Sequence, residues 1–319
     1  MTLAGGPDLK KSIVKILMIL LSVLFVAGSL AMLSKSRPLW SGTLIPDSCR
    51  KNDIDYSGIT NIIICGIMNE NGASLAEMTA LISINETAHE IGIMYLPGIT
   101  FVGEDKVKYG RLSGAFNWGT DSVPDGGAGA LSECISTLFG QRVDHYLTFD
   151  MKVLPQVTDL LDGVQLEVAE ELKFEDRTLE AGQHEFGSKE VLRYILSDSR
   201  ENVSSVSSIR QAFAEVVLNR LIKLPRTETW SLLLKCRNGI DTDLSVKEII
   251  EMKRSFDEVA DGSVSFFTIP GTVYTGYGTE KLSVWSVDRS AAIEMINTVL
   301  RKYNKKIIIE DLLIPELSF

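Results

Sequence analysis

The sequence lacks the short motifs that identify most nucleotide, hydrolase and zinc sites. It has no glycine-rich phosphate loop, no G-x-S-x-G elbow and no H-E-x-x-H motif. Its four cysteines form no C-x-x-C pair, and neither they nor the histidines have a partner at metal-ligand spacing. We therefore expect free or buried thiols at Cys49, Cys65, Cys134 and Cys236. An oxidising compartment would also allow disulfides, which the sequence does not pair.

Clustered positive charge is also missing. The chain has 32 Lys and Arg against 42 Asp and Glu, a net charge of −10. Residues 1–37 contain five basic residues and one acidic residue, so the remaining 27 basic and 41 acidic residues give a net charge of −14. Nucleic-acid binding needs clustered Lys and Arg that displace counterions from phosphates. The charge distribution therefore argues against a nucleic-acid partner.

The N-terminal region contains the one long hydrophobic run. Residues 16–33 form 18 positions without a charge, which at about 1.5 Å per residue nearly cross a hydrocarbon core of about 30 Å. Lys10, Lys11 and Lys15 precede the run and favour a cytoplasmic N-terminus. We predict a cytoplasmic segment over 1–15, a transmembrane anchor over 16–33, and a main domain outside the cytoplasm of a single-pass membrane protein.

A cleaved signal peptide is the main alternative for this run. Ser29–Ala31 provides a small-x-small cleavage site after a shorter apolar stretch. Both readings export the rest of the chain. A buried core helix fits less well, because the run is apolar on every side and lies at the extreme N-terminus.

The exported part shows alternating strand and helix patterns. Residues 34–57, with Pro38 and Pro46, are predicted as a stalk, residues 58–303 as the domain and residues 304–319 as a C-terminal tail. Dense β-branched runs and alternation predict strands over 60–67, 79–84, 90–96, 143–149, 164–168 and 264–269. Helical spacing predicts helices over 130–139, 151–161, 189–196, 208–223, 246–259 and 289–303. This order predicts an α/β fold with a mixed central β-sheet covered by helices.

Short stretches in a fixed order resemble the LytR-CpsA-Psr cell-envelope family over about residues 58–300. The individual stretches are weak, but their shared order is specific. They are Asn61–Gly66, Leu81–Asn85, Leu96–Pro97, Asp144–Asp150, Leu160–Val168, Ala181–His184 with Leu192–Tyr194, Arg210–Gln211, Thr242–Ile250, Thr268–Gly271 and Trp285–Asp288.

The resemblance implies a function class. Members of the family sit outside the membrane on one N-terminal anchor and hold a polyprenyl-pyrophosphate glycan in a hydrophobic tunnel. They transfer the phosphoglycan to peptidoglycan with help from a divalent metal. A polyprenyl-phosphate lipid or a cell-wall glycan is therefore the expected partner here, with Mg²⁺ as cofactor only if the family activity is retained.

This sequence departs from the family where phosphate and metal are bound. The family has Arg-Asp after Leu96–Pro97, whereas this chain has Gly98 and Ile99. The family's arginines after Tyr194 and its Asp and Arg before Arg210 are also missing. The residues at those positions are Leu196, Asp198, Ser204 and Ser207. Because phosphoryl transfer needs positive charge over the phosphate oxygens, these changes threaten catalysis.

Some polar residues remain as candidates. Arg210 and Gln211 keep family positions, and Glu77 keeps a carboxylate where the family has Asp, as a weak candidate metal ligand. Arg111, Arg193 and Arg200 lie nearby in sequence as possible replacements for the missing arginines. For His145 and His184 we expect packing or surface roles, and for Asp150 a helix N-cap.

Three functions are consistent with the sequence. The first is a catalytically degenerate family member that binds a lipid-linked or wall glycan or regulates an active paralogue. The second is an active phosphotransferase in which Glu77, Arg210 and other arginines converge on one cleft. The third is an unrelated exported α/β binding protein, which the absence of a lipid-sized apolar tunnel would favour.

Overall fold

The computed structural model describes residues 58–317, apart from 71, 105–106, 108–109, 120–122, 124, 175–176, 198–202, 260–262 and 279–280. The predicted cytoplasmic segment, anchor and stalk, together with Cys49, Asp198 and Arg200, lie outside these residues. Within the described part of the chain, no helix is long and apolar enough to cross a membrane. Cys65, Cys134 and Cys236 are buried thiols.

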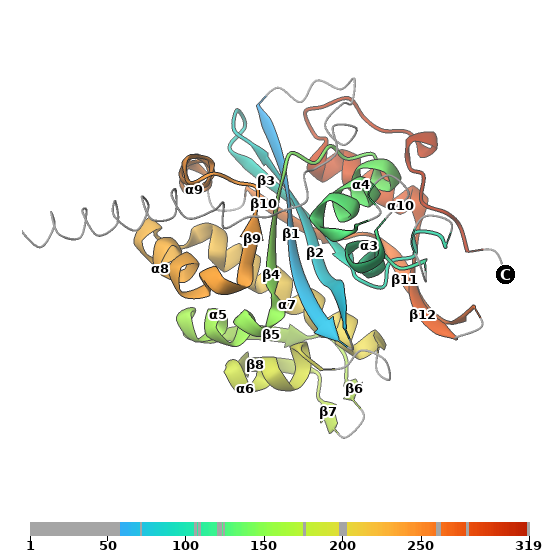
Figure 1. Ribbon diagram of the computed structural model, residues 1–319, viewed down its shortest axis with the longest axis horizontal. Coiled ribbons are helices and arrows are strands. Elements are labelled where there is room, and N and C mark those ends of the chain that lie inside the picture. The colour runs from blue at the N-terminus through green and yellow to red at the C-terminus, as the bar shows by residue number, and fades with distance from the viewer. Residues whose placement is uncertain are drawn as a thin grey trace, which may run out of the picture. The chain divides into compact units, whose positions relative to one another are not determined.

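A six-stranded mixed sheet forms the centre of the domain (Figure 1). The strand order is β10-β3-β2-β1-β4-β9. β1 pairs with β4 and β10 with β3 in parallel, and the other neighbours are antiparallel. The strands are β1 Ile59–Glu70, β2 Ala73–Asn85, β3 Glu90–Pro97, β4 His145–Asp150, β9 Ile240–Thr242 and β10 Val264–Thr268. This sheet confirms the predicted mixed α/β fold.

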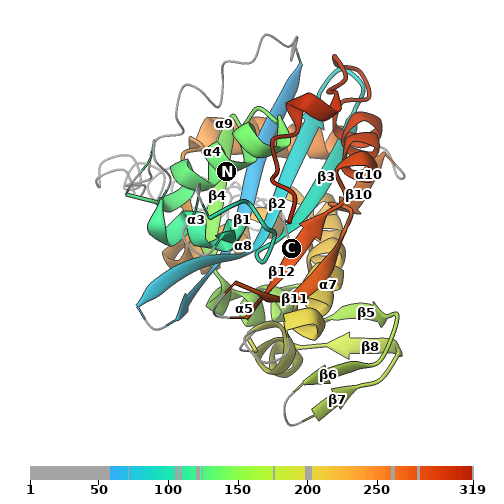
Figure 2. The same ribbon diagram turned by 90° about the vertical axis from the view of Figure 1, so that its right-hand side faces the viewer.

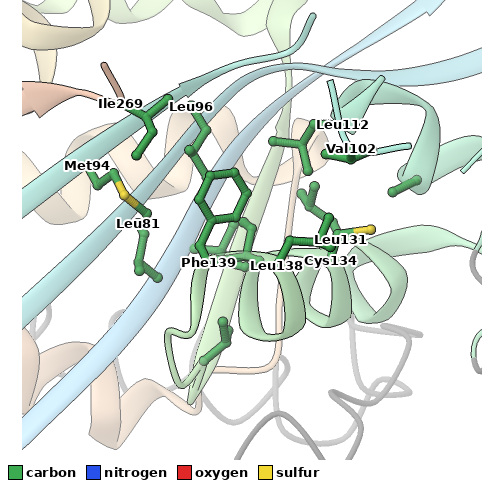
Figure 3. Packing of buried hydrophobic residues seen from close by; sticks show 14 of the residues in the cluster. Leu81, Met94, Leu96, Val102, Leu112, Leu131, Cys134, Leu138, Phe139 and Ile269 are labelled. Carbon is green, nitrogen blue, oxygen red and sulfur yellow. The ribbon is translucent and has the colours of Figure 1, made fainter. Parts of the chain in front are cut away.

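One face of the sheet packs against α3 (Leu112–Trp118), α4 (Gly127–Phe139) and α10 (Arg289–Met295). Because side chains alternate along a strand, Leu81, Met94 and Leu96 all point to this face. Figure 3 shows them packed beside Leu131, Leu138 and Phe139 of α4. Burial of these side chains fixes α4 to the sheet.

The opposite face packs against α5 (Leu154–Leu160), α7 (Val203–Lys223), α8 (Arg226–Cys236) and α9 (Val246–Glu258). Its strand residues include Ile62, Ile82 and Tyr95, which alternate with those of the first face. The domain therefore has three layers, with the sheet between two groups of helices (Figure 1).

Smaller elements complete the domain. β5–β8 and β6–β7 lie beside α7 (Figure 2), and β11–β12 form a hairpin. Their bounds are β5 Val164–Val168, β6 Leu172–Phe174, β7 Arg177–Leu179, β8 Gly182–Phe186, β11 Gly271–Tyr277 and β12 Leu282–Val287. The short helical elements are η2 Met151–Val153, α6 Ser188–Glu190, η3 Val191–Ile195, η4 Arg237–Gly239, η5 Ile296–Leu300 and η6 Ile309–Asp311.

All the predicted strands and helices are present, with shifted ends. The sequence analysis did not predict α3, α8 or β9. It also did not predict the strands β6, β7, β8, β11 and β12 of the three small pairs. These elements are short or carry apolar residues on one partly exposed face, so their periodicity is weak. The predicted C-terminal tail packs on the domain, because Ile307, Leu312 and Ile314 are buried in the core that contains α4.

Candidate functional site

A β-bulge orients Glu77. In the β1–β2 pairing, Met78 lies opposite Gly66 and Ala76 lies opposite Ile67, so Glu77 is the extra residue. Ala76 packs with the α4 face, whereas Met78 packs with α7. A bulge can turn two successive side chains to one face, which a regular strand does not allow. The Glu77 carboxylate consequently meets Arg210 of α7.

Arg210 is buried and bonded to several neighbouring groups. Its Nη1 donates to Oε2 of Glu77 at 2.7 Å, and the two side chains are 3% and 9% exposed. Its Nε donates to the carbonyl of Ile195 at 2.9 Å and its Nη2 to that of Ser197 at 3.2 Å. Arg210 therefore links β2, α7 and the residues around η3, and its charge is balanced by Glu77.

Gly98 leaves no space for a side chain. A Cβ atom here would lie 2.8 Å from the carbonyl oxygen of Ala76 and 2.9 Å from Cα of Glu77. Such contacts are shorter than packed atoms tolerate, so any side chain would displace the bulge. The next residue, Ile99, is buried and apolar. The absence of a side chain at 98, the buried Ile99 and the bulge at Glu77 are thus parts of one packing arrangement.

The other predicted site residues have different surroundings. Arg111 precedes α3, which covers the opposite face of the sheet, and its Nη2 donates to the carbonyl of Ser283 at 2.6 Å. The guanidinium of Arg193 lies 5.6 Å from the ring centre of Tyr194. Gln211, Leu196 and Ser207 are half-buried, and Ser204 is exposed. Among the candidates, the structure thus brings Glu77 and Arg210 into contact.

A thiol and a phenol near the ion pair are held neutral. Sγ of Cys65 lies 3.3 Å from Oγ1 of Thr79. Burial raises the pKa of Cys65 to about 12, and the charge of Glu77 adds to this effect. Burial also raises the pKa of Tyr95 well above its usual range. Because a thiolate or phenolate is the reactive form, neither group is suited to act as a nucleophile at neutral pH.

The described residues do not fit a divalent metal. No group of three or more His, Cys, Asp or Glu side chains among them could hold an ion. Mg²⁺ requires six oxygen ligands in octahedral geometry, several of which are usually water. Glu77 supplies one carboxylate whose Oε2 is already bonded to Arg210, and the nearby Ile99 is apolar.

Two of the three histidines lie away from the ion pair, and Asp150 has its predicted role. His145 is the first residue of β4, and its Nδ1 lies 3.4 Å from Oδ2 of Asp243. Nε2 of His184 contacts the carbonyl of Glu180 at 2.7 Å on the surface. Asp150 accepts a hydrogen bond from the backbone of Lys152 at 2.9 Å and caps η2, as expected.

An apolar cavity of about 200 Å³ lies between the sheet and helices α5, α7, α8 and α9. Its wall beside the ion pair includes Met78 and Tyr95, together with Phe213 and Ala214 one turn after Arg210. Among the described residues that line it, Lys253 is the one charged residue. The rest of the wall includes Ile64, Ala80, Ile82, Leu147, Phe149, Leu154, Val157, Val217, Leu218, Leu221, Leu232, Leu233, Ile249, Met252 and Phe256.

Comparison with known proteins relates both fold and sequence to one family. The sequence profile of the LytR_cpsA_psr family matches residues 47–301. The LytR-Csp2A-Psr enzyme from Actinomyces oris superimposes with a TM-score of 0.59 at 16% identity, covering 84% of this chain and 98% of that one. No curated protein sequence matches the chain.

Two further solved structures share the fold. TagV from B. subtilis has a TM-score of 0.57 at 14% identity, covering 76% of this chain and 96% of its own. A structure described as TagT bound to LIIa-WTA has a TM-score of 0.53 at 16% identity, covering 79% and 95%. At these identities the superpositions establish a common fold.

Proposed function

The chain belongs to the LytR_cpsA_psr family of cell-envelope proteins, and we propose that it binds a lipid-linked or wall glycan without catalysing phosphotransfer. Membership removes the alternative of an unrelated exported binding protein. The proposed loss of transfer chemistry rests on one observation. Arg210, the one basic residue kept at a family position, is bonded to Glu77 and to two carbonyl groups.

Positive charge determines how tightly a pyrophosphate is bound. Each charge-assisted arginine–phosphate contact contributes on the order of 1.5–3 kcal/mol. Losing several of them weakens pyrophosphate binding by orders of magnitude. None of these contacts is available from the residues at the family's arginine positions, which are Gly98, Leu196, Asp198 and Ser207. Arg210 is 3% exposed and its charge is balanced by Glu77, so it is poorly placed to supply the remaining one.

The apolar cavity supports retained lipid binding. TagT, which shares the fold, has been solved with LIIa-WTA bound. In this chain the cavity wall is apolar apart from Lys253 and a few hydroxyl and thiol groups. Such a wall favours a hydrocarbon chain through burial of apolar surface. An isoprenoid tail is the part of the family's ligand that it would hold.

The proposed location follows from the N-terminal sequence. Residues 16–33 anchor the protein in the cell membrane, residues 1–15 remain cytoplasmic, and the domain lies outside. The net charge of −14 beyond residue 37 argues against a nucleic-acid ligand.

An active phosphotransferase with non-standard ligands is the competing function. The family match through residue 301 favours it, because the C-terminal part of the pattern is retained. It requires Arg111, Arg193 or Arg200 to join Arg210 around a phosphate. Arg111 instead contacts the β12 backbone, and Arg193 lies over Tyr194.

Binding of two short isoprenoids to the full-length chain separates these functions. Geranylgeranyl pyrophosphate and geranylgeraniol share a tail and differ in the pyrophosphate, and each is titrated with and without Mg²⁺. Binding without transfer predicts similar affinities, within about threefold, and no effect of Mg²⁺. Metal-dependent binding that is at least about a hundredfold tighter for the pyrophosphate would support the active enzyme. Absence of binding by either compound would reject the cavity as a lipid site.

A further inference from the structure

α8 and α9 cover the apolar cavity but are weakly buried. Thr229, Leu232, Leu233 and Cys236 of α8 line it at helical spacing, as do Ile249, Met252, Lys253 and Phe256 of α9. Yet Cys236 and Lys253 are the only residues of these two helices that are buried. By contrast, α7 buries nine residues. Helices with few buried contacts open at lower free energy than the core.

An ion cluster joins these two helices at one end of α7. Lys253, although buried, donates from Nζ to Oδ1 of Asp257 at 2.5 Å and to the carbonyl of Ile222 at 3.1 Å. Nε of Arg226 donates to Oδ2 of Asp257 at 2.6 Å. Asp257 therefore connects α9 to the start of α8, and Lys253 connects α9 to the last turn of α7.

We propose that α8 and α9 form a lid on the apolar cavity, and that Asp257 is the latch that controls passage of an apolar chain. The proposal rests on the proposed lipid-binding function and adds the route by which a chain is admitted. The Asp257 side chain is 32% exposed, so water can replace its partners when the lid opens. Lys253 is held in place only while Asp257 balances its charge, because an unpaired buried ammonium is costly.

The small volume of the cavity supports the proposal that part of its wall moves. Pockets that enclose a drug-sized ligand have volumes of about 300–1,000 Å³, whereas this cavity has about 200 Å³. A long hydrocarbon chain therefore needs a wider space than the closed arrangement provides. The walls formed by the sheet and α7 are well packed, so α8 and α9 are the walls able to move.

The chain supplies a matched pair of variants for the test. Asp257→Asn removes the latch charge. Glu251→Gln removes a charge from the same helix, where Oε1 of Glu251 lies 3.6 Å from Nζ of the exposed Lys247. Both acids pair with a lysine four residues earlier on α9, but Glu251 contacts neither α7 nor α8 through that pair. N-phenyl-1-naphthylamine, an uncharged apolar fluorophore, is the probe.

Stopped-flow association of the probe with the full-length chain gives the readout. The latch predicts that Asp257→Asn raises the association rate about threefold to tenfold, while Glu251→Gln stays within about 1.5-fold of wild type. Equal rates for all three proteins, or equal acceleration by both variants, would overturn the latch while leaving the lipid site intact. If neither the wild type nor either variant binds the probe, the lipid site and the lid both fail.

Hydrogen exchange distinguishes opening of the lid from a defect in the whole fold. The latch predicts faster amide exchange in α8 and α9 of Asp257→Asn, with α7 and the central strands unchanged. Faster exchange throughout the domain would overturn it, since the substitution would then act on the whole fold.

Discussion

Nη1 of Arg210 lies 2.7 Å from Oε2 of Glu77, and both side chains are buried. This contact depends on a β-bulge in β2 and on the glycine at position 98 that packs against it. A buried arginine with a carboxylate and two carbonyl partners has a structural role.

Breaking this ion pair will destabilise the domain. Glu77→Gln leaves Arg210 charged, buried and without its counterion, which costs about 3–5 kcal/mol in the free energy of unfolding. Urea unfolding of the full-length chain measures the change, with Glu251→Gln on the surface of α9 as the control. A loss below about 0.5 kcal/mol for Glu77→Gln would show that the pair does not hold the fold.

A side chain at position 98 will not be tolerated well. Gly98→Ala places a Cβ atom 2.8 Å from the Ala76 carbonyl oxygen, and overpacking of this kind costs about 1–3 kcal/mol. Gly187→Ala is the matched control, because its Cβ would meet nothing closer than 3.4 Å, from Glu190 Oε2. Equal unfolding midpoints for the two variants would contradict the close packing of Gly98 against the bulge.

His145 will make stability depend on pH. Its hydrogen bond to Asp243 raises the pKa of His145 above the usual value, against the opposing effect of burial. Stability from this contact is therefore fully present below the unfolded-state pKa of about 6.5 and is lost as pH rises through the higher folded-state pKa.

The measurement is the difference in the free energy of unfolding between wild type and His145→Gln across this pH range. The difference should be largest near pH 6 and should shrink toward alkaline pH. His184→Gln, at an exposed position, is measured in parallel as the control. A His145→Gln difference that grows with pH would mean that the neutral form is the stabilising one.

Filling the cavity will block apolar ligands. Ala214 is buried in the wall formed by α7, so Ala214→Trp occupies the space that a hydrocarbon chain would use. We expect at least about a tenfold loss of geranylgeraniol affinity, whereas Leu192→Trp at an exposed site leaves it unchanged. Circular dichroism establishes that each variant is folded. Unchanged affinity in a folded Ala214→Trp protein would place the ligand elsewhere.

Sequence patterns predicted the central strands β1 and β2 because these strands are long and apolar on both faces. β1 and β2 read as dense Ile and Leu runs, and the stripe of α7 is regular. The short strands β6, β7 and β9 span three residues each, too few for a periodic signal. Their positions depend on tertiary contacts rather than on local sequence.

The site was only partly predictable for a related reason. Motif positions identified Glu77, Gly98 and Arg210 individually. The salt bridge between Glu77 and Arg210 depends on a β-bulge that no sequence motif predicts. A glycine replacing the family's arginine was the available signal of a packing change. The Lys253–Asp257 pair, four residues apart on α9, could have been noticed as a helical ion pair. Its burial against α7 could not.

A turnover assay on the full-length chain tests the loss of phosphotransfer most directly. The protein is incubated with a polyprenyl-pyrophosphate glycan, peptidoglycan and Mg²⁺, and glycan attached to peptidoglycan is measured beside an active member of the family. A chain whose Arg210 is held by Glu77 should transfer no more glycan than a sample without protein. Mg²⁺-dependent transfer above that background would contradict this and establish the chain as an active phosphotransferase.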